Sequence, residues 1–579
     1  MAFLRNFLAA FLALVVFFFF LFVLSIGFFS LLAQEEKPVV EENSVLHLKL
    51  NGIIRDRSVE DPFSELFGAN GPRVTSLMDL LRVIKEAKED DNIVGIYMEH
   101  LFISAGYSSL QELRDALLDF KSSGKFVYSY AEYMSEGDYY LASVADEIYL
   151  HPEGSMEFNG LSANVSFYKG LFEKLEIEPE IFRVGEFKSA VEPLIRKDLS
   201  AENELQLNAL LDDLNATYLS GTSESRGIDL DRLRTIQDKM EATLPNDFEQ
   251  LNLVTKVAYK DEIKSLILEK VEEDEIDDVN FISARSYRLS LPTQEYSPNR
   301  IAVIMAEGNI VMAGQPDQDI IGDQIAKEIR KARESSTTKA IVLRINSPGG
   351  SITASDIIWR EVALTKGVKP IIASFSDYAA SGGYYIGMAC DTIVAQRNTI
   401  TGSIGIFSIL FNFEQFLEKK LGITHDVVKT GEYSDYINLT RPFRDEERAI
   451  LQKSLQKGYD SFTGKAAEAR NMSKEQLIKL AGGRVWSGNE AFNNDLVDVL
   501  GSFDDAITLA AEAAGVDDDF RVTYYPRSKP FVEQLLENLS GEAVKVLYPE
   551  LDLPHLKELR KLAAMEGIQA RMLGEIEIN

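Results

Sequence analysis

Cysteine and histidine are scarce in this chain of 579 residues, and each shortage narrows the available chemistry. The single cysteine, Cys390, has no partner for a disulfide within the chain, and its apolar surroundings Ile386-Gly-Met-Ala-Cys390 indicate a small buried side chain rather than a reactive thiol. The five histidines are His47, His100, His151, His425 and His555. Because no Cys/His spacing typical of a zinc site is present, the sequence predicts no metal and no cofactor.

Positive charge is also in short supply. There are 60 Lys and Arg residues against 91 Asp and Glu residues, so the formal net charge is −31. Binding to nucleic acid requires clustered basic side chains that displace counterions from phosphates, and the sequence has no such cluster. Nucleic acid is therefore excluded as a partner. We interpret the acidity as a solvated surface that favours solubility; a surface shaped for a basic partner is the alternative.

A long uncharged run stands near the amino terminus. From Phe7 to Ala33 no charged residue interrupts a sequence rich in Phe, Leu, Val and Ala. A bilayer core requires about 20 apolar residues, whereas the apolar stretch of a cleavable signal peptide has about 7–15. Residues 1–36 are therefore predicted to be a membrane anchor. Because Arg5 precedes the run and acidic residues follow it, the positive-inside rule predicts a cytoplasmic amino terminus with the bulk of the chain outside.

The remaining chain is long enough for two or more domains with their own cores. Strand-like runs such as Ile93–Tyr97 and Ala340–Leu343 alternate with helical periods such as Asp356–Leu364. Strands separated by helices form βαβ units, so the pattern predicts an α/β fold with mostly parallel sheets.

The two halves of this pattern repeat each other when the chain is shifted by 245 positions. The shift places Tyr139-Tyr140 on Tyr384-Tyr385 and preserves the order strand, helix, strand, helix. A shared register over such a distance predicts internal duplication. We expect a first repeat over residues 37–300, a second over residues 301–515, and a tail over residues 516–579 to which the sequence assigns no role.

The two copies differ where catalytic groups would lie. The second has two glycine-rich segments, Asn346-Ser-Pro-Gly-Gly-Ser351 after a strand and Ala379-Ala-Ser-Gly-Gly383 at the start of a helix. In the first copy Glu136 takes the place of the serine in the second of these segments. With one inserted residue, Gly185-Glu-Phe-Lys188 of the first copy matches Gly431-Glu-Tyr-Ser434 of the second. Each copy thus holds half of a Ser/Lys pair, which predicts one active site built across both.

A serine hydroxyl becomes an effective nucleophile only when a nearby base accepts its proton. No histidine lies between positions 151 and 425, and lysine is the alternative base in Ser-Lys enzymes. A lysine needs its pKa lowered from about 10.4 to about 7–8 for this task, which burial can achieve. Lys188 has apolar neighbours, Phe187 and Ala190-Val191, so we predict Lys188 as the base for Ser381. The alternative is a surface lysine at the start of a helix.

The transition state of acyl transfer also requires donors for the developing oxyanion. Gly349-Gly350 lets the backbone approach a bound carbonyl, because no Cβ intrudes. Gly382-Gly383 after Ser381 would add free amides at a helix start. The alternatives are an ordinary turn for the first pair and a helix N-cap for Ser381. Two such loops at strand ends of one parallel sheet favour an active site.

Four segments in combination resemble the long, duplicated form of bacterial signal peptide peptidase A, also called protease IV. They are Arg183–Pro193, Asn346–Gly350, Tyr378–Tyr385 and Thr401–Ile406. The resemblance implies two tandem ClpP/crotonase-like repeats with a Ser-Lys dyad split between them. By that resemblance Ser381 is the nucleophile, Lys188 the base and Ser403 the residue that orients the lysine, and the amides of Gly350 and Gly382 form the oxyanion hole.

The resemblance also implies a function and a location. The expected enzyme is a serine endopeptidase that degrades signal peptides and other apolar peptides left in the membrane. The expected assembly is a bowl-shaped homotetramer, anchored by a single span in the bacterial inner membrane with its catalytic domains on the periplasmic side. Two alternatives remain open at this point. One is a catalytically inactive scaffold in membrane quality control, and the other is a crotonase-type acyl-CoA enzyme, which shares the oxyanion loops but has no Ser-Lys pair.

Overall fold

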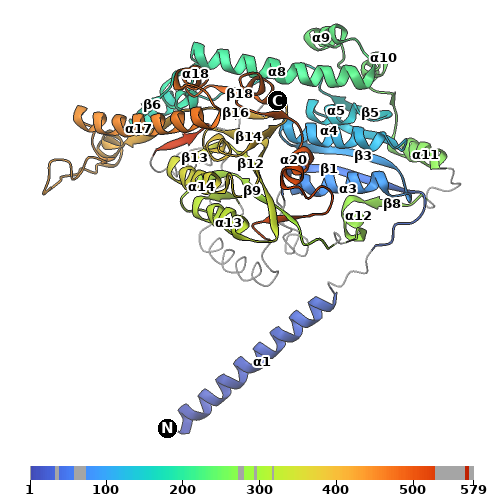
Figure 1. Ribbon diagram of the computed structural model, residues 1–579, viewed down its shortest axis with the longest axis horizontal. Helices are drawn as coiled ribbons and strands as arrows, with labels where there is room; N and C mark the ends of the chain where they lie inside the picture. Colours follow the sequence, from blue (N-terminus) through green and yellow to red (C-terminus); the bar gives the residue numbers. More distant parts are fainter. Residues whose placement is uncertain are drawn as a thin grey trace.

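The computed structural model describes residues 2–32, 38–57, 74–271, 279–292, 296–315, 318–527 and 568–572. The chain begins with helix α1 (Ala2–Leu32), and two α/β repeats follow (Figure 1). Among the described residues, none of the helices combines the length and the apolarity needed to cross a membrane. The side chains of residues 22–32 lie outside that description, so the anchor expected over residues 1–36 stays a prediction.

The first repeat is built on a wholly parallel sheet with the strand order β2-β1-β3-β4-β5-β7, and β8 pairs with β1. Its strands are β1 (Ser44–Arg55), β2 (Val74–Ser76), β3 (Ile93–Ser104), β4 (Phe126–Met134), β5 (Glu147–Met156), β7 (Lys256–Val257) and β8 (Phe281–Ser283). Its helices are α3 (Leu77–Glu89), α4 (Tyr107–Lys121), α5 (Glu136–Ala142), α6 (Lys169–Leu175), α7 (Glu192–Ile195), α8 (Ala201–Arg226), α9 (Leu230–Lys239), α10 (Pro245–Gln250), α11 (Lys260–Val271) and α12 (Ala284–Ser290).

Local sequence explains where these elements begin. In α3 the Ser76 side chain accepts a hydrogen bond from the Asp79 N–H, which satisfies one of the free amides of the first turn. Leu80, Val83 and Ala87 follow at helical spacing and are buried against the sheet. The predicted alternation of strands with amphipathic helices is therefore confirmed in this repeat.

The second repeat has the same plan. Its main sheet has the order β18-β16-β14-β12-β9-β20, with β15 between β14 and β19. The strands are β9 (Arg300–Glu307), β12 (Thr338–Ser347), β14 (Ile371–Ala380), β15 (Thr392–Ala395), β16 (Ile400–Gly402), β18 (Val485–Ser487), β19 (Val499–Leu500) and β20 (Arg521–Tyr525). The helices include α13 (Gly322–Glu334), α14 (Ile352–Thr365), α15 (Gly382–Gly387), α16 (Glu414–Phe416), α17 (Asp445–Ala469), α18 (Lys474–Leu480), α19 (Gly488–Asn493) and α20 (Phe503–Ala514).

The expected duplication is confirmed element by element. Shifting β2 and α3 by 245 positions gives the observed bounds of β11 (Asp319–Ile321) and α13. The same shift carries β3, α4, β4 and α5 onto β12, α14, β14 and α15. β20, which falls within the segment 516–579 set apart as a tail, pairs in parallel with β9 of the second sheet.

A third sheet joins the two repeats, with the order β11-β10-β13-β21-β17-β6. Its further strands are β6 (Glu178–Val184), β10 (Asn309–Val311), β13 (Gly349–Ser351), β17 (Ile406–Asn412) and β21 (Gln569–Arg571). β6 comes from the first repeat and β17 from the second, and they pair antiparallel from Val184 opposite Ile406 to Glu178 opposite Asn412. This pairing brings the chain that follows β6 against the second repeat.

A buried charge cluster also connects the repeats. The guanidinium of Arg344 on β12 lies 2.8 Å from Asp56 and 2.8 Å from Glu112, both in the first repeat, and all three side chains are about 1 % exposed. Beside it, Asp377 accepts hydrogen bonds from the amide and hydroxyl of Ser109 at 2.8 and 2.7 Å. Burial raises the pKa of Glu112 to about 7, although Arg344 opposes the shift. Arg344 therefore supplies positive charge to two buried carboxyl groups where the repeats meet.

Candidate active site

Ser381 lies in the turn between β14 and α15, and its backbone has an unusual conformation. Its φ of 56° and ψ of −109° are rare for a residue with a Cβ. The turn is held because the Ser381 N–H donates to the Gly402 carbonyl at 2.8 Å and the Tyr385 N–H donates to the Ser381 carbonyl at 2.9 Å. Strain of this kind concentrates at functional sites, where the surrounding structure enforces it.

Lys188 reaches this serine from the other repeat. It follows β6 and precedes a short 3-10 helix (Ser189–Val191), so the pairing of β6 with β17 carries it into the second repeat. Its Nζ lies 2.9 Å from the Oγ of Ser381, across 193 positions of sequence. Ser381 is 0 % exposed and Lys188 is 1 % exposed, so the pair is shielded from solvent.

The surroundings of the lysine favour the neutral amine. Burial lowers the pKa of Lys188 well below its usual value. The amine lies 2.9 Å from the hydroxyl and 3.1 Å from the carbonyl oxygen of Ser403. A neutral amine has two N–H groups, and donating them to these two oxygens leaves its lone pair for the hydroxyl of Ser381.

Glycines of the second repeat make room for the lysine, and sequence reasoning missed them. A Cβ on Gly483 would lie 2.6 Å from the Cβ of Lys188, and one on Gly405 would lie 3.2 Å from its Cδ. Nearby, the Phe187 N–H donates to the Gly482 carbonyl at 3.0 Å. The pair Gly482-Gly483 is visible in the sequence, but only the fold indicates what it approaches.

The predicted oxyanion glycines lie next to the serine turn. Gly349 has a φ of 102°, and a Cβ on it would lie 2.7 Å from the amide nitrogen of Gly382. A Cβ on Gly350 would lie 2.0 Å from the carbonyl oxygen of Ile310 on β10. Only glycine permits this approach. Gly350 and Gly382 therefore sit on adjoining segments beside Ser381.

The counterparts of the dyad in the opposite repeats do not form a second pair. Glu136, at the position of Ser381, is buried and accepts hydrogen bonds from the amides of Asn159 and Gly160 at 2.9 and 2.6 Å. Burial raises the pKa of this carboxyl. It occupies the position that Ser381 has in the second repeat.

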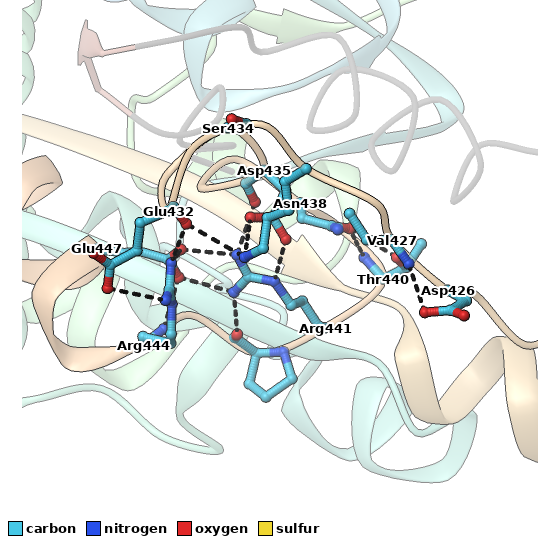
Figure 2. Close-up of polar contacts among 12 residues, drawn as sticks. Asp426, Val427, Glu432, Ser434, Asp435, Asn438, Thr440, Arg441, Arg444 and Glu447 are labelled. Atoms are coloured by element: carbon cyan, nitrogen blue, oxygen red, sulfur yellow. Dashed lines mark hydrogen bonds and ion pairs between the residues drawn. The ribbon is translucent and has the colours of Figure 1, made fainter.

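Ser434, at the position of Lys188, lies on an exposed loop (Figure 2). Its hydroxyl donates to the carbonyl of Gly431 at 3.0 Å. Below it, Arg441 donates to Asp435 at 3.0 Å and to Glu447 at 2.8 Å, which fixes the loop to α17. Of these four described positions, Lys188 and Ser381 contact each other, whereas their counterparts Ser434 and Glu136 bond to their own surroundings.

Three of the four histidines within the described part of the chain make contacts elsewhere. His47 contacts Glu99 at 3.0 Å, and His100 contacts Asp138 at 3.3 Å, both within the first repeat. His151 accepts a hydrogen bond from its neighbour Glu153, and His425 is exposed. His555 lies outside the described residues. Cys390 is buried, and burial raises the pKa of its thiol, as expected for an unreactive side chain.

A shielded serine in a strained turn, with an amine and a glycine loop beside it, is the arrangement of a serine hydrolase. Comparison with known proteins narrows this class. The model of peptidase family S49 matches residues 119–272 and 363–517, once in each repeat, and the Clp protease model matches residues 293–399.

Relatives of similar length share most of the chain. Protease 4 of Haemophilus influenzae is 36% identical over 93% of this chain and 90% of its own length. Protease 4 of Salmonella typhi is 34% identical over 92% and 88%, and the chloroplastic serine protease SPPA of Arabidopsis thaliana is 34% identical over 92% and 78%. The chain therefore belongs to peptidase family S49. It is a serine peptidase with two ClpP-like domains, which confirms the predicted enzyme class.

Proposed function

We propose that Ser381 and Lys188 form the catalytic dyad of this peptidase. The observation that carries the proposal is the 2.9 Å contact between a buried lysine amine and the hydroxyl of a serine in a strained turn. The neutral amine takes the hydroxyl proton as Oγ attacks the peptide carbonyl. The resulting ammonium then gives that proton to the departing amine, which leaves an acyl-enzyme. A water molecule, deprotonated by the same amine, releases the acid product and restores Ser381.

The other predicted site residues have supporting parts in this scheme. The amides of Gly350 and Gly382 donate to the oxyanion of the tetrahedral intermediate, which requires both to point into the same small space. Ser403 positions the lysine, because its hydroxyl and carbonyl oxygens accept the two N–H groups of the amine. Fixing the amine in this way directs its lone pair to Ser381 at no further entropic cost during the reaction.

Apolar peptides are the proposed substrates, and cleaved signal peptides are the proposed natural source. What supports this is an apolar cluster beside the serine, formed by Leu210 and Leu214 of α8 with Ala380, Ile400 and Val485. A peptide that binds there would gain its affinity from main-chain pairing and from apolar side-chain burial.

We further propose that residues 1–36 anchor the enzyme in the inner membrane of a bacterium, with both repeats on the periplasmic side. The support is the uncharged run from Phe7 to Ala33 and the single basic residue, Arg5, before it. Such an anchor would keep the active site close to peptides that are themselves held in the bilayer.

A homotetramer is the proposed assembly, and the internal symmetry supports it. Within the chain, β6 of the first repeat pairs with β17 of the second. The counterpart of β6 in the second repeat, residues 424–430, is exposed, and Val428 is 100 % exposed. This part of the chain extends away from the two repeats at the left of Figure 1. Head-to-tail contacts that reuse the β6 pairing would bury it in the next subunit and close a ring.

The dyad is tested with a fluorophosphonate probe and a short chromogenic ester. The wild type should react with the probe and should cleave the ester. In Ser381→Ala and Lys188→Ala the rates of probe labelling and of ester cleavage should both fall by about 10³-fold or more. Ser434→Ala is the matched control, because it removes the counterpart hydroxyl and should leave both activities unchanged. Labelling that persists in Ser381→Ala would reject the assignment.

A further inference from the structure

Both chain neighbours of Lys188 contact one buried side chain, that of Gln206 in the second turn of α8. The Nε2 of Gln206 donates to the hydroxyl of Ser189 at 2.9 Å and lies 3.3 Å from the carbonyl oxygen of Phe187. Gln206 is 2 % exposed, so these contacts are shielded from solvent. A single amide group therefore fixes the backbone on either side of the lysine.

The other end of this amide reaches the second repeat. The Oε1 of Gln206 accepts a hydrogen bond from the Val485 N–H on β18 at 3.2 Å. The carbonyl of the same peptide unit, that of Arg484, accepts one from the Ser403 N–H at 2.7 Å. The hydroxyl and carbonyl oxygens of Ser403 in turn accept from the amine of Lys188. A ring of hydrogen bonds thus runs from Gln206 through β18 to the lysine and returns through the loop of the lysine.

The same strand also supports the serine. β18 pairs antiparallel with β16, with Val485 opposite Gly402. The carbonyl of Gly402 accepts the hydrogen bond from the Ser381 N–H at 2.8 Å. Gln206 therefore contacts both the loop that carries Lys188 and the strand that is paired to the anchor of the Ser381 turn.

Gln206 is itself held in place by a buried polar network. Its Nε2 also donates to the Oδ1 of Asn203 at 2.9 Å, and the side-chain amide of Asn203 donates to Glu192 at 3.2 Å. Glu192 is 1 % exposed and accepts a further hydrogen bond from the hydroxyl of Ser200, the N-cap of α8, at 2.5 Å. Glu192 begins α7, just after the 3-10 helix that follows Lys188. Hydrogen bonds in a buried network strengthen one another, so the start of α8 and the lysine loop form one stiff unit.

The second repeat has no equivalent of this amide. α17 follows the loop of Ser434 as α8 follows the loop of Lys188. Gln206 is the sixth residue of α8, whereas the sixth residue of α17 is Ile450, which is 42 % exposed. The loop there is held instead by the arginine–carboxylate contacts drawn in Figure 2. The buried glutamine is therefore a feature of the repeat that supplies the lysine, and the plan of a repeat does not require it.

We infer that Gln206 is a positioning residue for the base, which holds the amine of Lys188 against Ser381 by joining the lysine loop to β18. The inference rests on the proposed function of the dyad. Gln206 acts through its neighbours and not on the substrate. A displacement on the order of 1 Å at a reacting group costs about 10²-fold in rate, and water admitted beside a buried amine favours its charged form. Both effects follow when the ring is opened.

The first test opens the ring in the full-length protein. Gln206→Met keeps a similar volume but makes none of the hydrogen bonds, so kcat for the chromogenic ester should fall about 10²-fold while KM stays within about twofold. The acidic limb of the rate profile should also move up by about one pH unit, because the amine is more easily protonated. An unchanged kcat with an unchanged pH profile would overturn the inference.

Asp213→Ala is the matched control for a general loosening of α8. Asp213 lies further along the same helix and accepts hydrogen bonds from the hydroxyl of Ser487 and, at 3.1 Å, from the side-chain amide of Asn489. This variant weakens the contact of α8 with the second repeat without touching the lysine loop. Urea unfolding should show a loss of stability, whereas kcat and the pH profile should stay as in wild type. Equal losses of kcat in Asp213→Ala and Gln206→Met would refute a positioning role.

The second test needs no catalysis. In a Ser381→Ala background, acetylation of Lys188 by acetic anhydride, followed by mass spectrometry, should be slow because this lysine is 1 % exposed. Gln206→Met should accelerate it about tenfold or more, Asp213→Ala should not, and the exposed Lys85 serves as the internal reference. Failure of the dyad assignment would leave this result intact. Equal acetylation rates with and without Gln206 would reject the inference even if Ser381 and Lys188 prove to be the dyad.

The third test asks whether Gln206 and Ser403 act through the same amine. Gln206→Met and Ser403→Ala should each lower kcat, and the double variant should lose less than the product of the two single losses, since residues of one network are not independent. Losses that multiply would show that the two residues act separately, which contradicts the ring.

Discussion

Gly483 contacts Lys188 so closely that a Cβ on the glycine would lie 2.6 Å from the Cβ of the lysine. Gly483→Ala should therefore push Lys188 away from Ser381, and kcat should fall about 10²-fold, the cost of a displacement on the order of 1 Å at a reacting group. Gly367→Ala is the control, since Gly367 has a similar φ of 79° but open space around it. Steady-state kinetics of both variants check this. Equal losses in the two would assign the effect to backbone strain alone.

The rate should depend on pH through the lysine. Because burial lowers the pKa of Lys188, the amine is neutral above that lowered value and becomes protonated as the pH falls through it. Only the neutral amine accepts a proton from Ser381, so kcat/KM for the ester should decline on acidification, by about tenfold for each pH unit below the lowered pKa. Lys188→Arg keeps a permanent charge and should be inactive at every pH. A profile that stays flat from about pH 5 to 9 contradicts lysine as the base.

Replacing the lysine by an apolar residue should stabilise the protein while it abolishes activity. Unfolding lets the Lys188 amine take up a proton that the folded state excludes, which favours the unfolded state at neutral pH. Lys188→Met should therefore raise the free energy of unfolding by about 1–4 kcal/mol, the range known for buried ion pairs that are replaced by hydrophobic residues.

The pH dependence of the stability gain distinguishes the loss of the buried amine from better packing alone. A lysine with a depressed folded-state pKa contributes most stability above its unfolded pKa, and the contribution is lost as the pH falls toward the folded value. The advantage of Lys188→Met over wild type should thus grow as the pH is lowered through that window. Urea unfolding at several pH values measures it, and an advantage that is independent of pH would attribute the gain to packing.

The ion cluster between the repeats gives a prediction about their assembly. Arg344→Ala removes the cation that compensates Asp56 and Glu112, which would remain buried, and the expected loss is about 3–5 kcal/mol in the free energy of unfolding. Ester cleavage should fall with it, because the dyad requires the two repeats to stay together. Lys85→Ala, which removes an exposed contact with Asp504, should change neither quantity. Thermal unfolding with parallel activity measurements provides the comparison.

Much of the fold was predictable, because repetition and hydrophobic periodicity are local properties of a sequence. The 245-residue shift anticipated the agreement of α3 with α13, and the alternating pattern anticipated the parallel sheets. The pairing of Lys188 with Ser381 was inferred from complementary losses in the two copies, and the structure brings these residues together.

The remaining features depend on contacts that no local pattern encodes. The pairing of β6 with β17 joins residues more than 200 positions apart, and the approach of Gly483 to Lys188 follows only from that pairing. β21 is three residues long and carries no periodicity, so its place between β13 and β17 could not be read from the sequence. Sequence analysis thus identified the reactive side chains of the site but missed the glycine and strand contacts that surround them.

The division of the proposed dyad between the two repeats couples activation of the enzyme to folding of the whole chain. During synthesis the lysine emerges 193 positions before the serine, so under the proposed dyad the amino-terminal half by itself lacks the nucleophile. On this proposal, peptide hydrolysis requires the later half of the chain to dock and β6 to pair with β17. If Ser381 and Lys188 act together as proposed, a truncated or misassembled chain cannot cleave peptides, and completion of the fold is itself the step that activates the enzyme.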